Sequence, residues 1–469
     1  MKRLILIALL FCISKVSITY AQETIGKPNV IVIVSDDAGY ADFGCYGGKE
    51  IPTPNIDALA KSGTLFTDAY VSASVCAPSR AGILTGMYQQ RFGFEHNVSK
   101  LPVAPYTQED VGMDIDIKTI GNQMQHNGYH TIALGKWHMG DDARYFPLQR
   151  GFDEFYGFVG GHRDFFGYKG QAPSPTQALY DNDKIVPESE VTYLTDMLTD
   201  RAVSFVKANA QQPFFMYLAY NAVHTPMNAK QELLDKFSHI TNPERRAYAA
   251  MMASLDEGVG ALVDALKKQN IYDNTLIVFI NDNGAATNNS ADNGKLRGLK
   301  GSKWEGGTRV AYIMQYPNYI PAGKKYHKMV SGLDIMPTAV GAANGQLIAG
   351  QITDGKNLLP YINGKIKKAP HSDLFWRRGI AAAVRSGKWK LIRSGDTNPV
   401  LLFNLEKDIS ETKNLANSHQ GKVKKLLRKL EAWEKTIEQP RWLSPYGDHN
   451  QVMKHRMEMI GREMETQYP

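Results

Sequence analysis

A cysteine at the start of an expected helix is the centre of the chemistry that this sequence could perform. Cys76 is followed by Pro78 and Arg80 and by an apolar segment that runs to about Tyr88. Proline fits the first turn of a helix, because its missing N–H would have no partner there. The helix N-terminus favours negative charge, so a reactive group at Cys76 would suit an anion. The alternative is a small core residue, which is the commoner role of a lone cysteine.

Two adjacent carboxylates, Asp36 and Asp37, form a second candidate site. They follow five apolar β-branched residues, 30–34, which are typical of a parallel strand buried on both faces. Buried carboxylates are costly unless they are paired or bind a cation. Ligands also gather beyond the carboxyl ends of parallel strands. A solvated turn at Gly39 is the alternative, but the position favours a metal, and oxygen donors suit Ca²⁺ or Mg²⁺ rather than zinc.

Three further apolar segments end in polar residues that could act in catalysis or metal binding. These are Lys136 and His138 after residues 129–134, His224 after residues 213–219, and Asp282 and Asn283 after residues 276–280. Taken singly, a lysine or histidine is usually solvated or satisfied, and Asn-Gly can simply be a turn. Because the carboxyl ends of parallel strands share one edge of a sheet, we expect these side chains to converge.

The elements that must position these residues predict an α/β fold. Helices are expected over residues 54–63, 76–88, 116–127, 194–209 and 245–269, between the apolar strand segments. From about Ala369 the pattern changes to antiparallel strands at 381–392 and 399–404. An amphipathic helix follows at 421–437. We therefore expect a large unit over residues 24–368 and a smaller C-terminal subdomain over residues 369–469.

The segment Cys76-Ala77-Pro78-Ser79-Arg80, followed by Ala-Gly-Ile-Leu-Thr-Gly, resembles the signature of the type I sulfatases. The resemblance extends from Asn29 to about Leu415. It implies an alkaline-phosphatase-like α/β fold: a large mixed, mostly parallel sheet sandwiched by helices, plus a small C-terminal α+β subdomain with an antiparallel sheet. It also implies hydrolysis of sulfate esters, a Ca²⁺ ion, and oxidation of Cys76 to the aldehyde formylglycine.

The same resemblance implies a role for each candidate residue. The implied metal ligands are Asp36, Asp37, residue 76, Asp282 and Asn283. The implied catalytic residues are Cys76, Arg80, Lys136, His138, His224 and Lys300. In this family one hydroxyl of the hydrated aldehyde attacks sulfur and the alcohol leaves. Deprotonation of the second hydroxyl then expels sulfate and restores the aldehyde. Lys300 is chosen because it stands six residues before Gly306-Gly307, with Lys303 as the competing choice.

A Gly-rich and aromatic stretch, residues 152–168, is expected to be a long loop. Long ordered loops often bind ligands, and His162 and Arg163 would suit a sulfated sugar. A lid packed by its own aromatic residues is an equal alternative. His96, in the loop 91–97, is a weaker candidate for a substrate contact.

The N-terminus has the pattern of a secretory signal. Met1-Lys2-Arg3 precedes an apolar run, residues 4–14, and Ala21 ends a plausible cleavage site. The run is too short to form a membrane span of about 20 residues. We therefore expect removal of residues 1–21 and a periplasmic or secreted protein with no stable membrane span. Removal takes away three positive charges and no acids, which lowers the formal net charge from +7 to +4.

The composition limits the partners. The charge is mildly basic, which suits an anionic substrate, but no stripe of Lys and Arg with interleaved aromatics indicates nucleic-acid binding. The expected partners are a sulfated carbohydrate, such as a glycosaminoglycan or algal polysaccharide fragment, and a formylglycine-generating enzyme or radical maturase. After the signal, Cys45 and Cys76 are the remaining cysteines, and a disulfide between them is an open alternative.

Two other functions remain open at this point. A phosphatase or phosphodiesterase of the same superfamily would ordinarily use Ser or Thr and two zinc ions with more His ligands. An inactive protein that binds sulfated glycans would keep an unmodified thiol at Cys76 and bind no metal.

Overall fold

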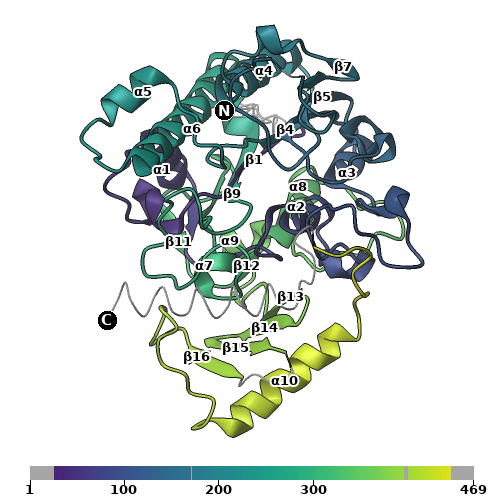
Figure 1. Ribbon diagram of the computed structural model, residues 1–469, viewed down its shortest axis with the longest axis vertical. Helices are drawn as coiled ribbons and strands as arrows, with labels where there is room; N and C mark the ends of the chain where they lie inside the picture. The colour runs from purple at the N-terminus through teal and green to yellow at the C-terminus, as the bar shows by residue number, and fades with distance from the viewer. Residues whose placement is uncertain (1–25, 171, 396–399, 445–469) are drawn as a thin grey trace, which may run out of the picture.

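A ten-stranded sheet organises the chain. The computed structural model describes residues 26–170, 172–395 and 400–444 (Figure 1). The expected signal segment therefore lies outside the described residues. In spatial order the strands are β11 (Lys324–Tyr326), β2 (Thr64–Phe66), β10 (Tyr312–Gln315), β9 (Thr275–Asn281), β1 (Asn29–Ser35), β8 (Phe214–Ala219), β4 (His130–Lys136), β5 (Glu154–Phe158), β6 (Tyr180–Asp181) and β7 (Lys184–Ile185).

Strand β1 lies in the middle of this sheet and is parallel to both neighbours, β8 and β9. Its side chains alternate between two hydrophobic cores. Val30, Val32 and Val34 enter one core, and Ile31 and Ile33 enter the other. Burial on both faces explains why the strand is an uninterrupted run of apolar β-branched residues.

Helices cover both faces of the sheet. One face packs against α2 (Cys76–Thr85), α3 (Ile120–His126) and α8 (Ile335–Ala342), and the other against α1 (Pro54–Ser62), α4 (Leu194–Asn209) and α6 (Pro243–Lys268). The two groups lie on opposite sides of β1 in Figure 1. Short elements complete this part: β3 (Ala69–Tyr70) paired with β12 (Val330–Ser331), α5 (Gln231–Lys236), α7 (Glu305–Thr308) and α9 (Leu359–Ile362). The expected α/β architecture is confirmed. No helix among residues 26–170, 172–395 and 400–444 is long and apolar enough to cross a membrane.

Several expected boundaries were wrong, among them three in the large unit. Helix α2 ends at Thr85 rather than near residue 88, because Gly86 adopts a left-handed conformation with φ 64°. Helix α3 begins at Ile120 rather than at 116, since the Thr119 side chain accepts a hydrogen bond from the Asn122 N–H in a capping box. Strand β5 occupies part of the stretch that we expected to be a loop, residues 152–168.

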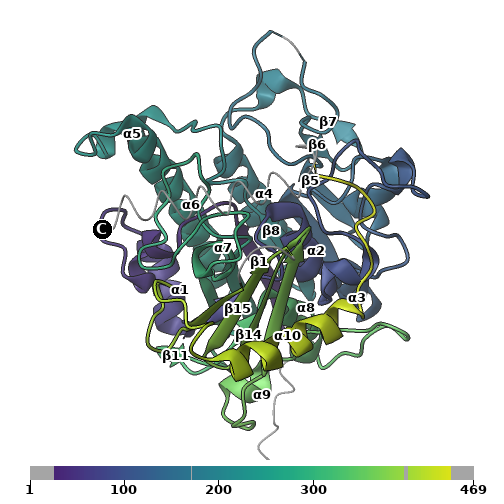
Figure 2. The same cartoon turned by 60° about the horizontal axis from the view of Figure 1, so that its bottom comes forward.

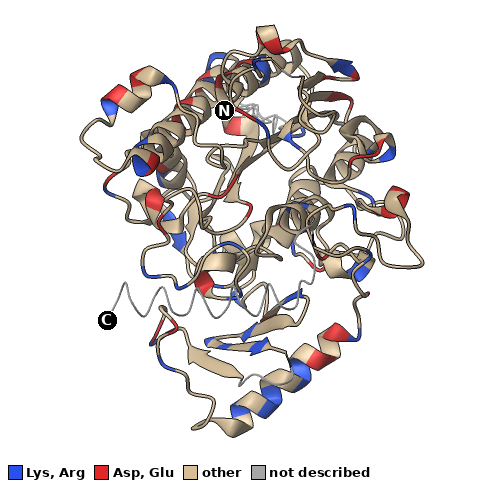
Figure 3. Ribbon diagram, viewed as in Figure 1, with Lys and Arg blue, Asp and Glu red and all other residues tan. Residues whose placement is uncertain are grey.

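The C-terminal part is a four-stranded antiparallel sheet crossed by a helix (Figure 2). Its elements are β13 (Asp373–Arg378), β14 (Ala381–Ser386), β15 (Trp389–Ser394), β16 (Leu401–Asn404) and α10 (Gln420–Glu434). The sequence did not indicate β13. Helix α10 packs Leu426, Leu430 and Trp433 against one face of the sheet. Lysine and arginine residues recur along this helix (Figure 3), and Lys424, Lys425 and Arg428 are exposed.

The other face of this small sheet packs against the large unit. Trp376 lies in one cluster with Tyr70 and Trp304, and its Nε1 donates to the Val71 carbonyl at 2.7 Å. A buried ion cluster joins the two parts further along. Lys390 Nζ lies 2.8 Å from Glu305 and 3.1 Å from Glu411, with all three side chains fully buried. These contacts fix the start of α7, and with it the loop that carries Lys300, against the C-terminal sheet.

Candidate active site

Four neighbouring parallel strands end at the same edge of the large sheet. Strands β9, β1, β8 and β4 lie side by side in that order. The residues that follow them are Asp282 and Asn283 after β9, Asp36 and Asp37 after β1, His224 beyond β8, and Lys136 and His138 at the end of β4. The structure thus brings together the groups that the sequence placed at separate strand ends.

Buried ion pairs hold this edge together. Arg80 points its Nε and Nη2 at Asp282 Oδ2, both at 2.9 Å, and Nη2 lies 3.4 Å from Asp36 Oδ2. Lys136 Nζ donates to the same Asp36 oxygen. Burial acts to raise the pKa of Asp36, but the nearby positive charges, Lys136 foremost, outweigh it and hold the pKa well below its usual range. Burial and the charge of Asp36 raise the pKa of Asp282 instead.

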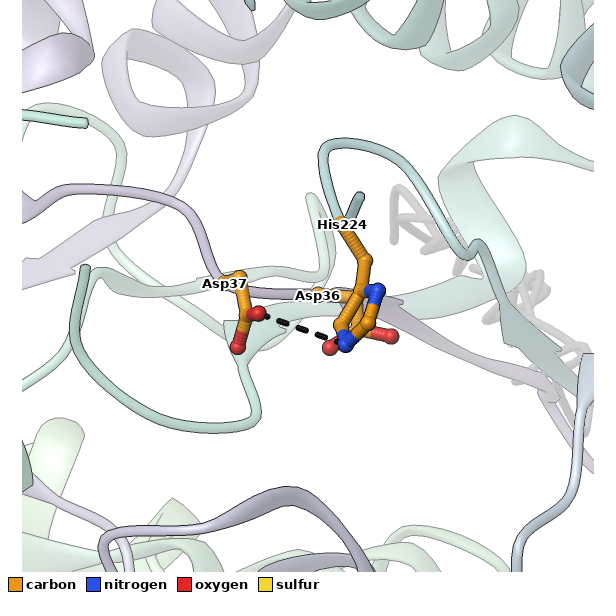
Figure 4. A group of neighbouring side chains, drawn as sticks. All are labelled: Asp36, Asp37 and His224. Atoms are coloured by element: carbon orange, nitrogen blue, oxygen red, sulfur yellow. Dashed lines mark ion pairs between the residues drawn. The ribbon is translucent and has the colours of Figure 1, made fainter. Parts of the chain in front are cut away.

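The oxygen atoms at this edge fit a hard divalent cation. Asp36 Oδ1 and Asn283 Oδ1 are buried, and neither has a hydrogen-bond partner among the described residues. One ligand atom each from Asp36, Asp37 and His224 lie within 4.8 Å of one another (Figure 4). Buried oxygens without partners are costly, and a bound cation would satisfy them. A donor set dominated by carboxylate and amide oxygens suits Ca²⁺.

The turn that carries Asn283 is held in place by close packing and by a side-chain hydrogen bond. Gly284 packs so closely on the neighbouring loop that an added Cβ would lie 1.7 Å from the Gly306 carbonyl oxygen. Only glycine fits at this approach. The Asn283 side chain donates to Asp37 Oδ1 at 2.7 Å, so the turn after β9 is tied directly to the turn after β1.

Lys300, rather than Lys303, faces the carboxylates. Its Nζ lies 2.6 Å from Asp37 Oδ1. The Gly301 N–H donates to the Ser74 carbonyl, which places the lysine loop beside the segment before Cys76. Lys303 points elsewhere, and its Nζ donates to Ser74 Oγ at 3.4 Å. The geometry therefore favours Lys300 as the lysine that meets an anion next to Asp37.

Cys76 is the first residue of α2 and is almost completely buried. Burial acts to raise the pKa of its thiol, but the charges of Lys136 and Lys300 outweigh burial and lower it. Asn97 was missed by the sequence analysis: its Oδ1 accepts from the Ala77 N–H at 3.2 Å and lies 3.8 Å from Cys76 Sγ. Cys45 and Cys76 are both free, so the disulfide alternative is excluded in this structure.

Two histidines approach the site with neutral rings. Burial, followed by the charge of Lys136, lowers the pKa of His138 well below its usual value. Burial also lowers the pKa of His224. The Nδ1 of His224 donates to the Thr225 carbonyl at 2.6 Å, which leaves Nε2 facing Asp37 Oδ2 at 3.5 Å (Figure 4). Each ring can therefore accept or hold a proton inside the cavity.

These groups open into a cavity of about 520 Å³. Its lining includes Asp37, Cys76, His138, His162, His224 and Lys300 of the predicted residues, together with Asn97, Asp141, Thr176, Asn288 and Arg378, which the sequence analysis did not single out. These additional residues come from loops and from β13, and no motif or strand pattern marks them.

Two of the weaker candidates lie away from the cavity lining. Arg163 is fully buried, forms an ion pair with Glu188 at 2.9 Å and lies over the Tyr168 ring. His96 is also buried, and burial lowers its pKa to about 3. A substrate contact for either residue remains a prediction without geometric support. His162 differs, because its ring stacks on His224 at 6.4 Å and lines the cavity.

The family model and the relatives that match this chain agree with one another. A family model described as Sulfatase matches residues 28–345. Arylsulfatase J of Mus musculus is 31% identical over 464 residues, covering 87% of this chain and 76% of that protein. N-acetylgalactosamine-6-sulfatase of Canis lupus familiaris is 30% identical over 380 residues, covering 77% and 71%. The crystal structure of Ps i-CgsB in complex with k-i-k-neocarrahexaose superimposes with a TM-score of 0.83 at 40% identity, covering 94% of this chain and 100% of that chain.

Proposed function

Since this chain belongs to the sulfatase family and is a sulfuric ester hydrolase, we propose that it acts on a sulfated saccharide through a formylglycine derived from Cys76 and a bound Ca²⁺ ion. One observation carries this proposal. The side chain at position 76 starts helix α2 inside a cavity where Lys300 and His224 also line the wall. The helix N-terminus and the lysines favour the negative charge of a sulfate group.

The aldehyde would supply the nucleophile that no ordinary side chain in the cavity provides. When hydrated, it offers one hydroxyl for attack on sulfur and a second whose deprotonation regenerates the aldehyde. Arg80 and His138 are the residues that would hold and deprotonate this group, because Arg80 is fixed by Asp282 and His138 lines the same cavity. The neutral His138 ring can accept that proton.

A bound calcium ion would neutralise the charge of the substrate and polarise the sulfate. Asp36, Asp37, Asp282 and Asn283 would hold it, together with the modified residue 76. The buried oxygens of Asp36 and Asn283 that have no hydrogen-bond partner among the described residues support this assignment. Lys300, whose pKa is raised because the charge of Asp37 outweighs burial, and His224, once its ring has taken up a second proton, would protonate the leaving oxygen, since both line the cavity next to Asp37.

Neither of the two alternative functions is favoured by the structure. Structural similarity to a phosphonate monoester hydrolase, at 21% identity and a TM-score of 0.62, reflects the fold alone. The metal candidates are mainly oxygen donors with one nearby histidine, which disfavours a two-zinc phosphatase. An inactive glycan-binding protein would have no need for the buried pairing of Arg80 and Lys136 with carboxylates behind residue 76.

A sulfated saccharide is the substrate class that the comparisons favour. Ps i-CgsB has been crystallised with k-i-k-neocarrahexaose, and another relative is an N-acetylgalactosamine-6-sulfatase. Release of inorganic sulfate from a panel of defined carrageenan and glycosaminoglycan oligosaccharides tests this proposal. Activity on aryl or steryl sulfates but on none of the saccharides would overturn the substrate class.

The location of the modified residue constrains maturation. Cys76 is 2% exposed in the folded chain. A formylglycine-generating enzyme or radical maturase would therefore act on the segment 76–80 before it folds. We propose that residues 1–21 direct export, that the protein works in the periplasm or outside the cell, and that residues 24–368 form the catalytic domain with 369–469 as its C-terminal subdomain.

Replacement of Lys300 tests sulfate binding. Lys300→Met is expected to lower kcat/KM for sulfate ester hydrolysis by about 10²–10³-fold, because it removes a positioned charge from a partly desolvated site. The matched control is Lys295→Met, which removes an exposed lysine from the same loop region. Steady-state kinetics on one substrate measure both variants. Equal activity of the two would show that Lys300 does not contact the transferred sulfate.

Calcium binding should be visible in stability as well as in activity. Titration of chelator-treated protein with Ca²⁺ is expected to raise its melting temperature. At a free Ca²⁺ concentration 100 times the dissociation constant, the free energy of unfolding should increase by about 2.7 kcal/mol. Asp37→Asn should abolish most of this shift, because it removes one carboxylate charge from the oxygen cluster. Differential scanning calorimetry gives the result. A calcium shift of the same size in the variant would rule out this site.

A further inference from the structure

A single buried carboxylate of the C-terminal part meets the loop that carries Lys300, residues 297–305, which we call the lysine loop. Glu411 lies between β16 and α10, and its side chain is fully buried. Its backbone adopts the left-handed conformation, with φ 53°, which residues other than glycine rarely adopt. A buried charge and this backbone conformation both cost free energy, so specific contacts must hold Glu411 in place.

Glu411 contacts both ends of the lysine loop. At the start of the loop, Arg297 Nη1 donates to the backbone carbonyl of Glu411 at 2.8 Å. At its end, the Glu305 N–H donates to Glu411 Oε2 at 2.7 Å. The two ends also meet each other, because the Gly306 N–H donates to the Arg297 carbonyl at 2.7 Å. The lysine loop is therefore closed at its base, and this base rests on Glu411.

Two backbone hydrogen bonds place the middle of the lysine loop at the active site. The Lys300 N–H donates to the Ala285 carbonyl at 2.8 Å, and the Gly301 N–H donates to the Ser74 carbonyl at 2.7 Å. With its base also held, the backbone of the loop is fixed on both sides of the lysine. This arrangement keeps Lys300 Nζ 2.6 Å from Asp37 Oδ1.

The base of the lysine loop is tied to the C-terminal sheet rather than to the strands that end at the active site. Lys390 Nζ, on β15, lies 3.1 Å from Glu411 Oε1 and 2.8 Å from Glu305 Oε1. The Arg297 guanidinium lies over the Trp304 ring, 4.0 Å from its centre. Trp304 belongs to the hydrophobic cluster that this sheet forms with the large unit. A change at Glu411 would therefore be transmitted to the lysine loop.

We propose that Glu411 is a positioning residue for the reaction, which holds the base of the lysine loop so that Lys300 meets the sulfate ester. This inference rests on the proposed function and deepens it, because Glu411 itself does not line the cavity. The ammonium group of a lysine ends a flexible four-carbon stem, so its alignment depends on where the backbone is fixed. A displacement of about 1 Å at a reacting group can cost about 10²-fold in rate.

A double-mutant cycle with Lys300 separates positioning from a general loss of stability. Glu411→Ala is expected to lower kcat/KM by about 10- to 100-fold on the sulfate ester that the wild type hydrolyses. In a Lys300→Met background the same substitution should cost about 2-fold or less, because the group that it misplaces is already absent. A general loss of stability would instead lower the activity in both backgrounds alike.

A conservative variant and a control complete the kinetic test. Glu411→Gln should lower kcat/KM by only about 3- to 10-fold, because its amide oxygen can still accept the Glu305 N–H while the charge is lost. The control Glu434→Gln breaks an ion pair with Arg393 at 2.6 Å in the same C-terminal part, and it should keep nearly full activity. Melting temperatures check that each variant is folded, and Glu411→Gln alone decides the question if the Ala variant is not.

Hydrogen exchange measured by mass spectrometry gives a second result that does not need turnover. Amide protons of residues 297–305 should exchange about 10-fold faster in Glu411→Ala than in the wild type, and also faster in Glu411→Gln, as loss of a charge-assisted hydrogen bond at the loop base predicts. Exchange in α2 should not change, and Glu434→Gln should leave the lysine loop as it is in the wild type.

Three results would overturn the positioning role: full activity of the Glu411 variants, an effect of the same size with and without Lys300, or unchanged exchange in the lysine loop. Failure of the proposed function is distinct. It appears as absence of sulfate release from saccharides by the wild-type enzyme, whatever the exchange of the lysine loop.

Discussion

Cys76→Ala is expected to abolish sulfate ester hydrolysis, lowering kcat/KM by about 10⁴-fold or more, while the protein still folds. The reason is that the aldehyde derived from this residue is the proposed nucleophile, and the other groups in the cavity only bind charge or move protons. The folded state should survive, because the substitution removes one buried atom from the first turn of α2 and breaks no ion pair among the described residues. Inorganic sulfate release and far-UV circular dichroism measure the two quantities.

Cys45→Ala is the matched control for this variant. Cys45 is also a free cysteine, but it lies near Asp57 and outside the cavity lining. Burial and the charge of Asp57 raise the pKa of its thiol, which makes it unreactive. The control should keep nearly full activity. Substantial turnover by Cys76→Ala, or loss of turnover by Cys45→Ala, would contradict covalent catalysis at position 76.

Asp36→Asn is expected to lower the free energy of unfolding by about 3–5 kcal/mol, because it leaves Lys136 and Arg80 as buried cations that have lost a carboxylate partner. The comparison is made in the presence of a chelator, so that loss of a metal does not contribute. Urea unfolding measures the effect. Asp196→Asn is the control, since Asp196 pairs with Lys230 at a partly exposed position and should cost less than about 1 kcal/mol.

The pH dependence of this variant has a definite sign. The pKa of Asp36 is lower in the folded protein than in the unfolded chain. Its contribution to stability is therefore fully present above the unfolded pKa of about 4 and is lost as the pH falls through and below that value. As the pH is lowered from about 6 to below the unfolded pKa, the free energy of unfolding of the wild type should therefore fall more than that of Asp36→Asn. If the free energies of unfolding of the wild type and Asp36→Asn fall in parallel as the pH is lowered, Asp36 is not charged in the folded protein.

The strands that position the site could be predicted from the sequence because they are buried on both faces. Residues 30–34 form an uninterrupted apolar run, and such runs mark central parallel strands regardless of what surrounds them. The polar residues after these runs then fall at one edge by topology alone. This is why the positions of Asp36, Asp282 and His224 followed from pattern and chain order.

Residues supplied by loops could not be found in this way. Asn97 meets Cys76 only because the loop after α2 returns to the N-terminus of that helix. Arg378 reaches the cavity because Glu95 anchors a hairpin from the far end of the chain. The late start of α3 has a local cause: the capping box of Thr119 and Asn122 outweighs the apolar spacing that begins near 116.

The measurement that tests the account most directly is the mass of the peptide that contains residue 76, taken from protein fractions that release sulfate. The account predicts that sulfur has been replaced by oxygen with loss of two hydrogens, which is the change from cysteine to formylglycine. Active protein in which this peptide carries an unmodified thiol throughout would contradict it.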